Sequence, residues 1–150
     1  MSEVSEEAGD QPNPFDQHPG VDWLLARLVN FAELDLSISV TLTVGGLIIS
    51  GNVISGRKYF EAVASKMKSA NLTGDTDPSI PENLEKLFLS FREVYPKPSS
   101  EGPPIKPAFI HLGDARVVMG GGQVVGGGDL FWRIKLASVD SCSFGSFSNS

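Results

Sequence analysis

Residues 36–55 read LSISVTLTVGGLIISGNVIS and carry the clearest structural pattern in the chain. From Leu36 to Val44 every second residue is apolar, and Ser or Thr fills the positions between. Strict alternation predicts a strand with one buried face. The next two residues, Gly45-Gly46, accept the positive φ angles of a tight hairpin turn, so the chain is predicted to return as a second strand over Leu47–Ser55.

A two-residue turn also predicts how these two strands pair. The facing pairs on the apolar side are Val44 with Leu47, Leu42 with Ile49, Val40 with Gly51, and Ile38 with Val53. Gly51 places no side chain opposite Val40, which allows a sharp bend of the strand or the close approach of another backbone. The hairpin therefore predicts a strongly curved sheet.

Helical spacing appears on both sides of the hairpin. Apolar residues three and four apart predict a helix from Val21 to Ala32. After the hairpin, residues 57–95 form a predicted helical insert with two amphipathic helices, near 57–71 and 80–95. The second helix is expected to begin with a capping box over Ser79–Glu82. Residues 96–107 hold five of the ten prolines and are predicted to be an exposed linker back to the sheet.

The last third of the chain returns to strand patterns. Two strand pieces, residues 109–112 and 115–119, are expected to join at Gly113-Asp114. The glycine-rich residues 120–128 are predicted to form a flexible hairpin loop. Another alternating strand follows at 130–136, and the alternation slips at Ser138-Val139, which predicts a bulge or corner before the final strand at 143–147.

These elements predict an α+β fold: a small, strongly bent antiparallel sheet or an Sm-like five-stranded barrel, with an N-terminal helix and an inserted helical pair. Residues 1–20 carry four acids in their first ten positions and three prolines, so they are predicted to be a disordered tail. Residues 21–147 are predicted to be a single domain, and residues 148–150 a frayed end.

Charge is distributed unevenly along the chain. The net charge is −6, but residues 1–20 contribute −5, from five acids and no Lys or Arg, so residues 21–150 sum to −1. A nearly neutral body argues against nucleic-acid binding, which needs a clustered basic surface. A single cysteine, no strongly apolar run of about 18 residues and an acidic N-terminus together predict a cytoplasmic protein without a membrane contact.

The sequence predicts no catalytic residue, no metal site and no cofactor. His111 with nearby Asp114 could be a base and its orienting acid, but a histidine that alternates with apolar residues on a strand is more often structural. Two histidines and one cysteine, widely separated, do not form a metal cluster. The glycine run lacks the spacing and the following helix of a phosphate-binding loop.

Candidate interaction residues lie on one predicted strand and one predicted helix. On the strand, Arg133 and Lys135 alternate with aromatic neighbours, an arrangement that some proteins use to stack bases but that is also typical of a solvated strand face. Amphipathic helices usually cover a core, and they also provide partner surfaces. The candidates are Phe131, Trp132, Arg133 and Lys135 on the strand, and Tyr59 and Phe60 on the helix.

Several short blocks resemble the gas vesicle accessory protein U family across residues 34–147. The most specific are FIHL at 109–112 and FWR at 131–133, together with the Leu34–Ile38 block and the Tyr59-Phe60 pair. The resemblance implies a cytosolic, non-enzymatic protein, associated with gas vesicles, that organises or clusters vesicles and contacts the shell or other gas vesicle proteins. Open sheet edges make homo-oligomers an expected state. The alternative is an Sm-like oligomeric RNA-binding protein or a general protein-interaction module.

Overall fold

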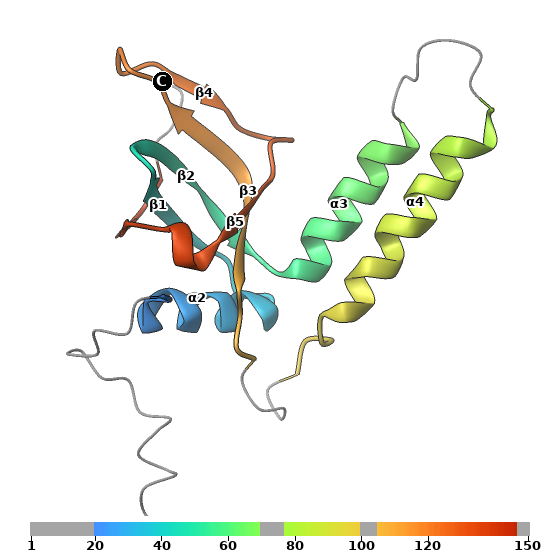
Figure 1. Ribbon diagram of the computed structural model, residues 1–150, viewed down its shortest axis with the longest axis horizontal. Coiled ribbons are helices and arrows are strands. Elements are labelled where there is room, and N and C mark those ends of the chain that lie inside the picture. Colours follow the sequence, from blue (N-terminus) through green and yellow to red (C-terminus); the bar gives the residue numbers. More distant parts are fainter. Residues whose placement is uncertain (1–19, 70–76, 100–104, 147–150) are drawn as a thin grey trace, which may run out of the picture.

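The computed structural model describes residues 20–69, 77–99 and 105–146. The predicted tail at 1–20 and frayed end at 148–150 lie outside these ranges, apart from Gly20. The described chain has an N-terminal helix, an antiparallel sheet and a pair of helices that stands away from the sheet (Figure 1). The prediction of an α+β fold with an inserted helical pair is confirmed.

The hairpin has the predicted turn and register. Strands β1 (Ile38–Val44) and β2 (Leu47–Ile54) meet at Gly45 and Gly46, whose φ angles are 57° and 84°. All four predicted facing pairs are present, from Val44 with Leu47 to Ile38 with Val53. At Gly51, a Cβ would lie 2.9 Å from the carbonyl oxygen of Gly113, and the pairing of β2 with β3 shifts there. Gly51 therefore permits both the predicted backbone approach and an irregularity in the sheet.

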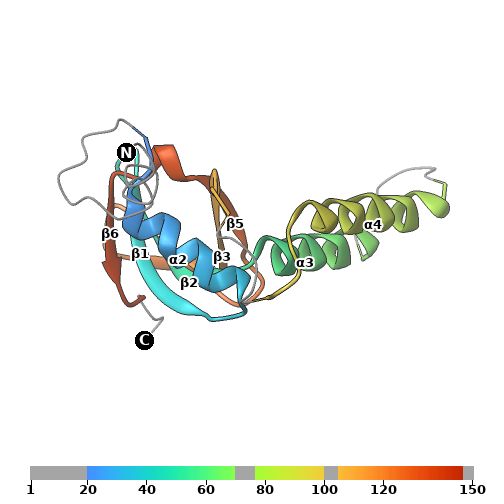
Figure 2. The same cartoon turned by 90° about the horizontal axis from the view of Figure 1, so that it is seen from below.

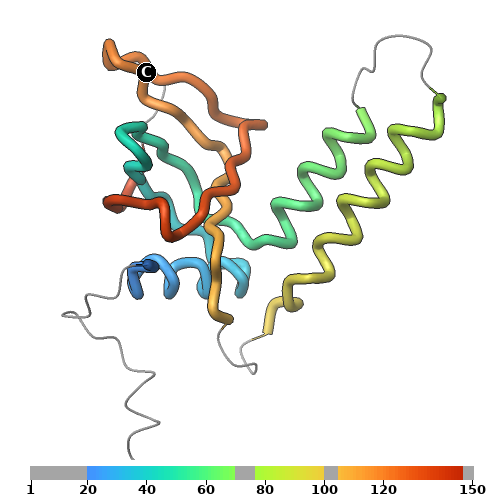
Figure 3. Tube along the Cα trace, viewed as in Figure 1, coloured from blue at the N-terminus to red at the C-terminus, as the bar shows by residue number. Residues whose placement is uncertain are grey.

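The sheet has six strands in the order β4-β3-β2-β1-β6, and β5 pairs with the other half of β3. The remaining strands are β3 (Phe109–Val118), β4 (Val124–Gly126), β5 (Trp132–Lys135) and β6 (Ser141–Phe144). The 3-10 helix η2 (Leu136–Ser138) forms the predicted corner between β5 and β6. The tube in Figure 3 shows this corner, where the chain leaves one end of the sheet and returns at the other.

Two details of the strand prediction were wrong. The expected pieces 109–112 and 115–119 are one continuous strand, because the left-handed Asp114, with a φ of 48°, is accommodated in a β-bulge at which Asp114 and Ala115 lie opposite Gly51. Residues 120–128 are not only a loop, since Val124–Gly126 forms β4 on β3. The five-stranded barrel is also not found: within the described ranges the six-stranded sheet is open, because β5 and β6 pair with β3 and β1 and not with each other.

Helix α2 (Trp23–Glu33) covers the sheet and closes the core (Figure 2). Asp22 accepts a hydrogen bond from the backbone N–H of Leu24 at its N-terminus. Its buried face, which includes Leu25, Leu28 and Val29, packs with strand residues that are 0–7% exposed. Each fully buried aliphatic side chain contributes about 1.5–3 kcal/mol. The core therefore lies between α2 and the curved sheet.

The helical pair is here called the arm: α3 (Gly56–Lys68), α4 (Ser79–Phe91) and the 3-10 helix η1 (Arg92–Val94). Figures 1 and 2 show it extending to one side of the sheet. The predicted capping box is wrong, because Ser79 makes no side-chain cap in this structure. Instead the Asp77 carboxylate accepts from the Ser79 N–H at 2.9 Å and from its hydroxyl at 2.8 Å. Asp77 thus satisfies the first N–H of α4, whereas the predicted box would have satisfied the N–H of Glu82.

Candidate interaction site

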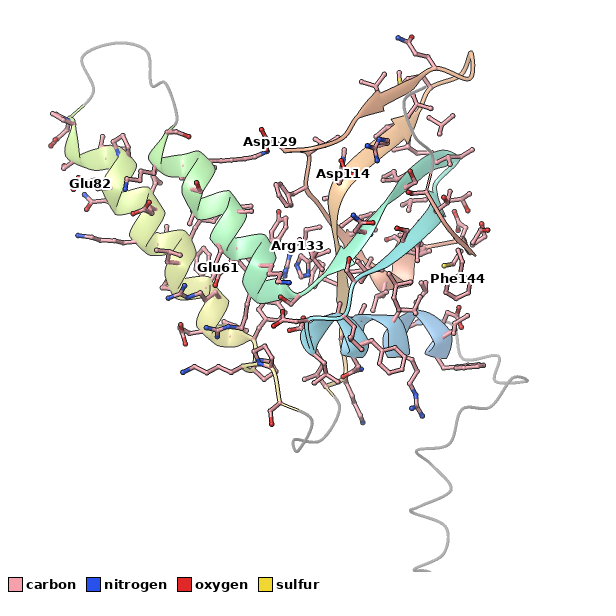
Figure 4. All side chains as sticks on the ribbon, turned by 180° about the vertical axis from the view of Figure 1, so that it is seen from behind. Glu61, Glu82, Asp114, Asp129, Arg133 and Phe144 are labelled. Carbon is pink, nitrogen blue, oxygen red and sulfur yellow. The ribbon has the colours of Figure 1, made fainter. Side chains whose placement is uncertain are left out.

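The arm meets the sheet in a cluster of rings around one guanidinium group. Tyr59 and Phe60 come from the first turns of α3, and Arg133 lies on β5, between α3 and the sheet (Figure 4). Cross-strand pairing places His111 of β3 directly opposite Arg133. The root cluster, as it is called below, consists of Tyr59, Phe60, Tyr95, Phe109, His111 and Arg133. The structure thus brings together candidates that are more than seventy residues apart in the sequence.

His111 is buried at 1% exposure and takes one fixed role in this cluster. Its Nε2 lies 2.7 Å from an Arg133 guanidinium nitrogen. Arginine has only donors, so Nε2 must accept and the proton of the neutral imidazole must sit on Nδ1. Burial, together with the smaller effect of the positive charge of Arg133, lowers the pKa of His111 to about 3. A buried imidazole in this state is a structural acceptor, which argues against the catalytic interpretation.

Arg133 is held by rings and hydroxyl groups. Its guanidinium carbon lies 3.8 Å from the Phe109 ring centroid and 5.4 Å from that of Phe60. It also donates to the Tyr95 hydroxyl at 2.8 Å. No carboxylate among the described residues forms an ion pair with it, so the aromatic faces carry the stabilisation of its charge. Arg133 is therefore half-buried, whereas the alternation of its strand favours a solvated position.

Tyr59 completes the packing on the imidazole. Its ring centroid lies 4.6 Å from that of His111, and Tyr95 approaches the same ring edge-on at 5.6 Å. Phe60 contacts Tyr59 at 5.1 Å. Burial raises the pKa of the Tyr59 hydroxyl. These contacts make the start of α3 a fixed attachment to β3 and not a free helix end.

The two ends of the arm and the end of α2 meet next to the root cluster. A Cβ on Gly56 would lie 2.4–2.5 Å from atoms of the Tyr95 ring, so only glycine lets this ring pack against α3. Arg57 donates to the carbonyl oxygens of Arg92 and Tyr95, at 3.3 and 3.2 Å. The buried Glu33 of α2 accepts from the Gly56 N–H at 2.9 Å, and burial raises the pKa of that carboxyl group. Three elements are therefore joined at one point.

The other candidate residues on the β5 segment point to different surroundings. The ring of Phe131 lies 5.2 Å from the Lys66 ammonium group, and Lys66 also donates to the Asp129 carbonyl. Trp132 is 37% exposed, although the alternation of the strand places it on the buried face. Lys135 is exposed. Of the six candidates, Trp132 and Lys135 are thus the two whose side chains are open to a partner.

Sequence reasoning did not anticipate the link through Tyr95 and Glu33. Tyr95 is separated from β5 by the proline-rich segment, and no local pattern indicates that its hydroxyl reaches Arg133. Glu33 ends an amphipathic helix, where a carboxylate is ordinarily solvated. The apolar residues of 80–94 did carry a usable signal of a second contact surface on this helix. They cover more of the helix than the one face that α3 contacts.

Neither a metal-binding group nor a membrane-spanning helix is found among the described residues. Residues 20–69, 77–99 and 105–146 contain no group of three His, Cys, Asp or Glu side chains placed to hold a metal ion. Over the same ranges, no helix has the length and apolar character needed to cross a bilayer.

Comparisons with known proteins identify the family. No curated protein and no solved structure matches the chain. The family described as gas vesicle protein GvpU-like matches residues 22–147, a range that contains α2, the whole sheet, the arm and the root cluster. The resemblance seen in the FIHL and FWR blocks is confirmed by this match. The chain belongs to the GvpU-like family of gas vesicle proteins.

Proposed function

We propose that this protein is a non-enzymatic accessory protein that organises or clusters gas vesicles by self-association and by contacts with the vesicle shell. Family membership over residues 22–147 is the observation that carries the link to gas vesicles. The neutral, buried His111 supports a role without catalysis, because the histidine of the fold is used to attach the arm.

Shell contact is assigned to the exposed residues of β5. Trp132 offers an exposed aromatic surface on one face of the strand, and Lys135, three residues along and therefore on the other face, offers a charge. Aromatic residues with a nearby cation are typical anchors of protein interfaces. Phe131, Arg133, Tyr59 and Phe60 act in this proposal by holding β5 and the arm in place.

Self-association is assigned in part to the ends of the sheet. Strands β6 and β5 each have one ladder partner in the described sheet, β1 and β3 respectively. An edge strand exposes unpaired backbone groups that a second chain can satisfy. Phe144 on β6 is 62% exposed and lies at the end of the sheet away from the arm (Figure 4).

A flotation experiment tests the shell contact, because gas vesicles rise on centrifugation and carry bound protein with them. The double variant Trp132→Ala/Lys135→Ala is compared with Trp23→Ala/Lys97→Ala, which removes an equally exposed tryptophan (40%) and an exposed lysine elsewhere. We expect the wild type and the control to float, and the β5 variant to lose about tenfold in apparent affinity, ~1.4 kcal/mol. A wild type that stays in the lower layer, or equal losses in both variants, would contradict the proposal.

Deletion of the gene in a vesicle-forming host tests the organising role. Electron micrographs of the deletion strain should show vesicles that are dispersed or fewer. Vesicles with unchanged grouping and number would count against a clustering role.

The alternative function, Sm-like RNA binding, has a weaker basis. The Arg133 guanidinium is engaged with His111, Tyr95 and Phe109, which leaves Lys135 as the exposed cation on this strand. Titration with labelled single-stranded RNA at low salt separates the two functions. Saturable binding at micromolar protein would favour the alternative.

A further inference from the structure

Helix α4 carries an apolar surface that α3 does not cover. The α4 stripe, as it is called below, comprises Ile80, Leu87 and Val94, with exposed fractions of 38, 49 and 79%. Phe91, at 36%, borders the stripe and packs its ring against Phe60 of α3, with ring centroids 5.7 Å apart. None of the residues of α4, all of which the structure describes, is buried. Figure 2 shows why, since the arm stands beside the sheet and α4 has only α3 along its length.

Helical geometry places the α4 stripe and the ion pairs of the arm on opposite flanks. Ile80 and Leu87 are seven residues apart, so they follow one line along α4 within about 20°. Val94 continues this line into η1, where the tighter 3-10 turn displaces it by a few tens of degrees. Glu85 and Arg92 are also seven apart, and they pair with Lys68 and Glu61 of α3 at 3.8 and 3.3 Å. The two lines are separated by two residues, about 200° around the axis. One flank is therefore charged and paired across the arm, and the other is apolar and open.

We propose that the α4 stripe binds the same stripe of a second copy of this chain, with the two α4 helices antiparallel and Leu87 at the twofold axis. Ile80 and Val94 lie seven residues on either side of Leu87, so this arrangement sets Ile80 of one copy opposite Val94 of the other. The residue types match, apolar on apolar, over the whole stripe. Isologous contact of this kind is the commonest way in which identical chains associate.

Charge favours the antiparallel direction. Asp77 and Glu82 give the first part of α4 a charge of −2, whereas Arg92, Glu93 and Lys97 sum to +1 at its end. Antiparallel packing brings unlike ends together and opposes the helix dipoles. Asn83 and Ser90, which lie beside the stripe on its outer side, are exposed and uncharged, so two copies approach without like-charge repulsion there.

The length of the surface sets the strength of the contact. From Ile80 to Val94 the stripe extends about 22 Å along α4 and η1. A single helix face of this length buries less than the roughly 800 Å² per partner of a stable interface. The dimer is therefore weak and concentration-dependent. It deepens the proposed self-association and rests on it, because weak contacts add up where many copies share one vesicle surface.

Cysteine cross-linking tests the register directly. Cys142, the single cysteine of the sequence, is first replaced by alanine. In that background Leu87→Cys is expected to form disulfide dimers on mild oxidation at least about tenfold faster than Lys86→Cys, which is the neighbouring exposed residue on another face. Ile80→Cys mixed with Val94→Cys should cross-link, and Ile80→Cys alone should not. Equal rates at Leu87 and Lys86, or cross-linking of Ile80→Cys with itself, would overturn the arrangement.

Sedimentation measurements on uncross-linked protein test the contact at equilibrium. Leu87→Glu should shift the wild-type dimer to monomer at the same concentration, and Lys86→Glu should not. Leu87 is half exposed, so circular dichroism melts should show that both variants remain folded. A wild type that is monomeric at several hundred micromolar, or a Leu87→Glu variant that still dimerises, would overturn the proposal.

Flotation with vesicles separates this inference from the proposed function. Leu87→Glu is expected to bind single vesicles like the wild type while losing the dimer. If Leu87→Glu instead abolishes flotation and the wild type shows no dimer, the stripe binds the shell and the second-copy assignment is wrong. A wild type that dimerises through Leu87 but never floats would support this inference and contradict the proposed function.

Discussion

Helices α2 and α4 have similar apolar spacing and different surroundings. In α2 five residues are buried, including Leu25 and Leu28, because the helix lies along the curved sheet. In α4 none of the thirteen residues is buried, because the helix packs on α3 alone. An apolar stripe therefore predicts that a helix face will be covered. It does not predict whether the chain's own sheet or a separate partner covers it. The covered face stabilises the fold, and the uncovered one is available for a partner.

The attachment of the two helices explains the difference. Helix α2 runs into β1 within four residues and is held over the sheet by its whole length. The arm is fixed at its root by Gly56, Arg133 and Tyr95, and by the ion pair of Lys58 with Asp35, while the ion pairs farther along join α3 to α4. The body should accordingly control the stability of the protein, and the outer part of the arm should contribute little.

Truncation of a leucine in each region tests this contrast most strongly. Leu42→Ala in the core, where the side chain is 0% exposed, should lower the free energy of unfolding by about 2–5 kcal/mol. Leu87→Ala on α4 should change it by less than about 0.5 kcal/mol. Urea denaturation at a protein concentration where the wild type is monomeric measures both. Comparable losses would mean that the arm and the body form one equally packed unit.

The root of the arm is tested by filling the space at Gly56. Alanine is a better helix former than glycine by about 1 kcal/mol, so on propensity alone Gly56→Ala would stabilise α3. The collision with the Tyr95 ring should reverse the sign and cost about 1–3 kcal/mol. Urea denaturation measures the loss, and near-ultraviolet circular dichroism reports the displaced ring. Gly120→Ala is the control, because nothing lies within 4 Å of its Cβ; a stabilised Gly56→Ala variant would show that the ring is not packed there.

Acid should loosen the same junction through His111. The unfolded histidine binds a proton below about pH 6.5, whereas the native one does so only near 3, so stability is fully present above 6.5 and is lost as pH falls toward 3. The slope from this group is at most about 1.4 kcal/mol per pH unit. Urea denaturation between pH 7 and 4 should show a shallower acid loss in His111→Gln than in the wild type.

Glu33 changes the stability with pH in the opposite direction to His111. The wild type must therefore be compared with His111→Gln. Its pKa is raised by burial, so the stability that comes from its protonated form is present below its ordinary value and is lost as pH rises through the native pKa. The Glu33 contribution is present in both the wild type and His111→Gln. Subtracting the stability-against-pH profile of the variant from that of the wild type therefore removes it. Proton NMR gives an independent check, since the His111 ring signals of the wild type should stay at their neutral positions down to about pH 4. A midpoint near 6.5 would disprove the burial of His111.

Local rules were sufficient where neighbours in sequence are also neighbours in space. The β1–β2 register follows from alternation and a two-glycine turn, and Gly51 marks the place where another backbone approaches. They were insufficient where partners come from distant segments. The capping box of α4 was placed on Ser79, although Asp77 accepts from the Ser79 N–H, and β4 was hidden in a glycine run because its strand character depends on pairing with β3.

The α+β class, the curved hairpin, the helical insert and the family resemblance follow from local patterns, because each depends on periodicity or on short blocks within a few dozen residues. The packing of the folded chain accounts for the rest. It joined Arg133 to His111 and Tyr95, left the sheet open, and exposed Trp132 and the α4 stripe. An apolar or charged residue has the same local pattern whether its partner is within the chain or outside it, so only the packed chain shows which of these residues already have a partner.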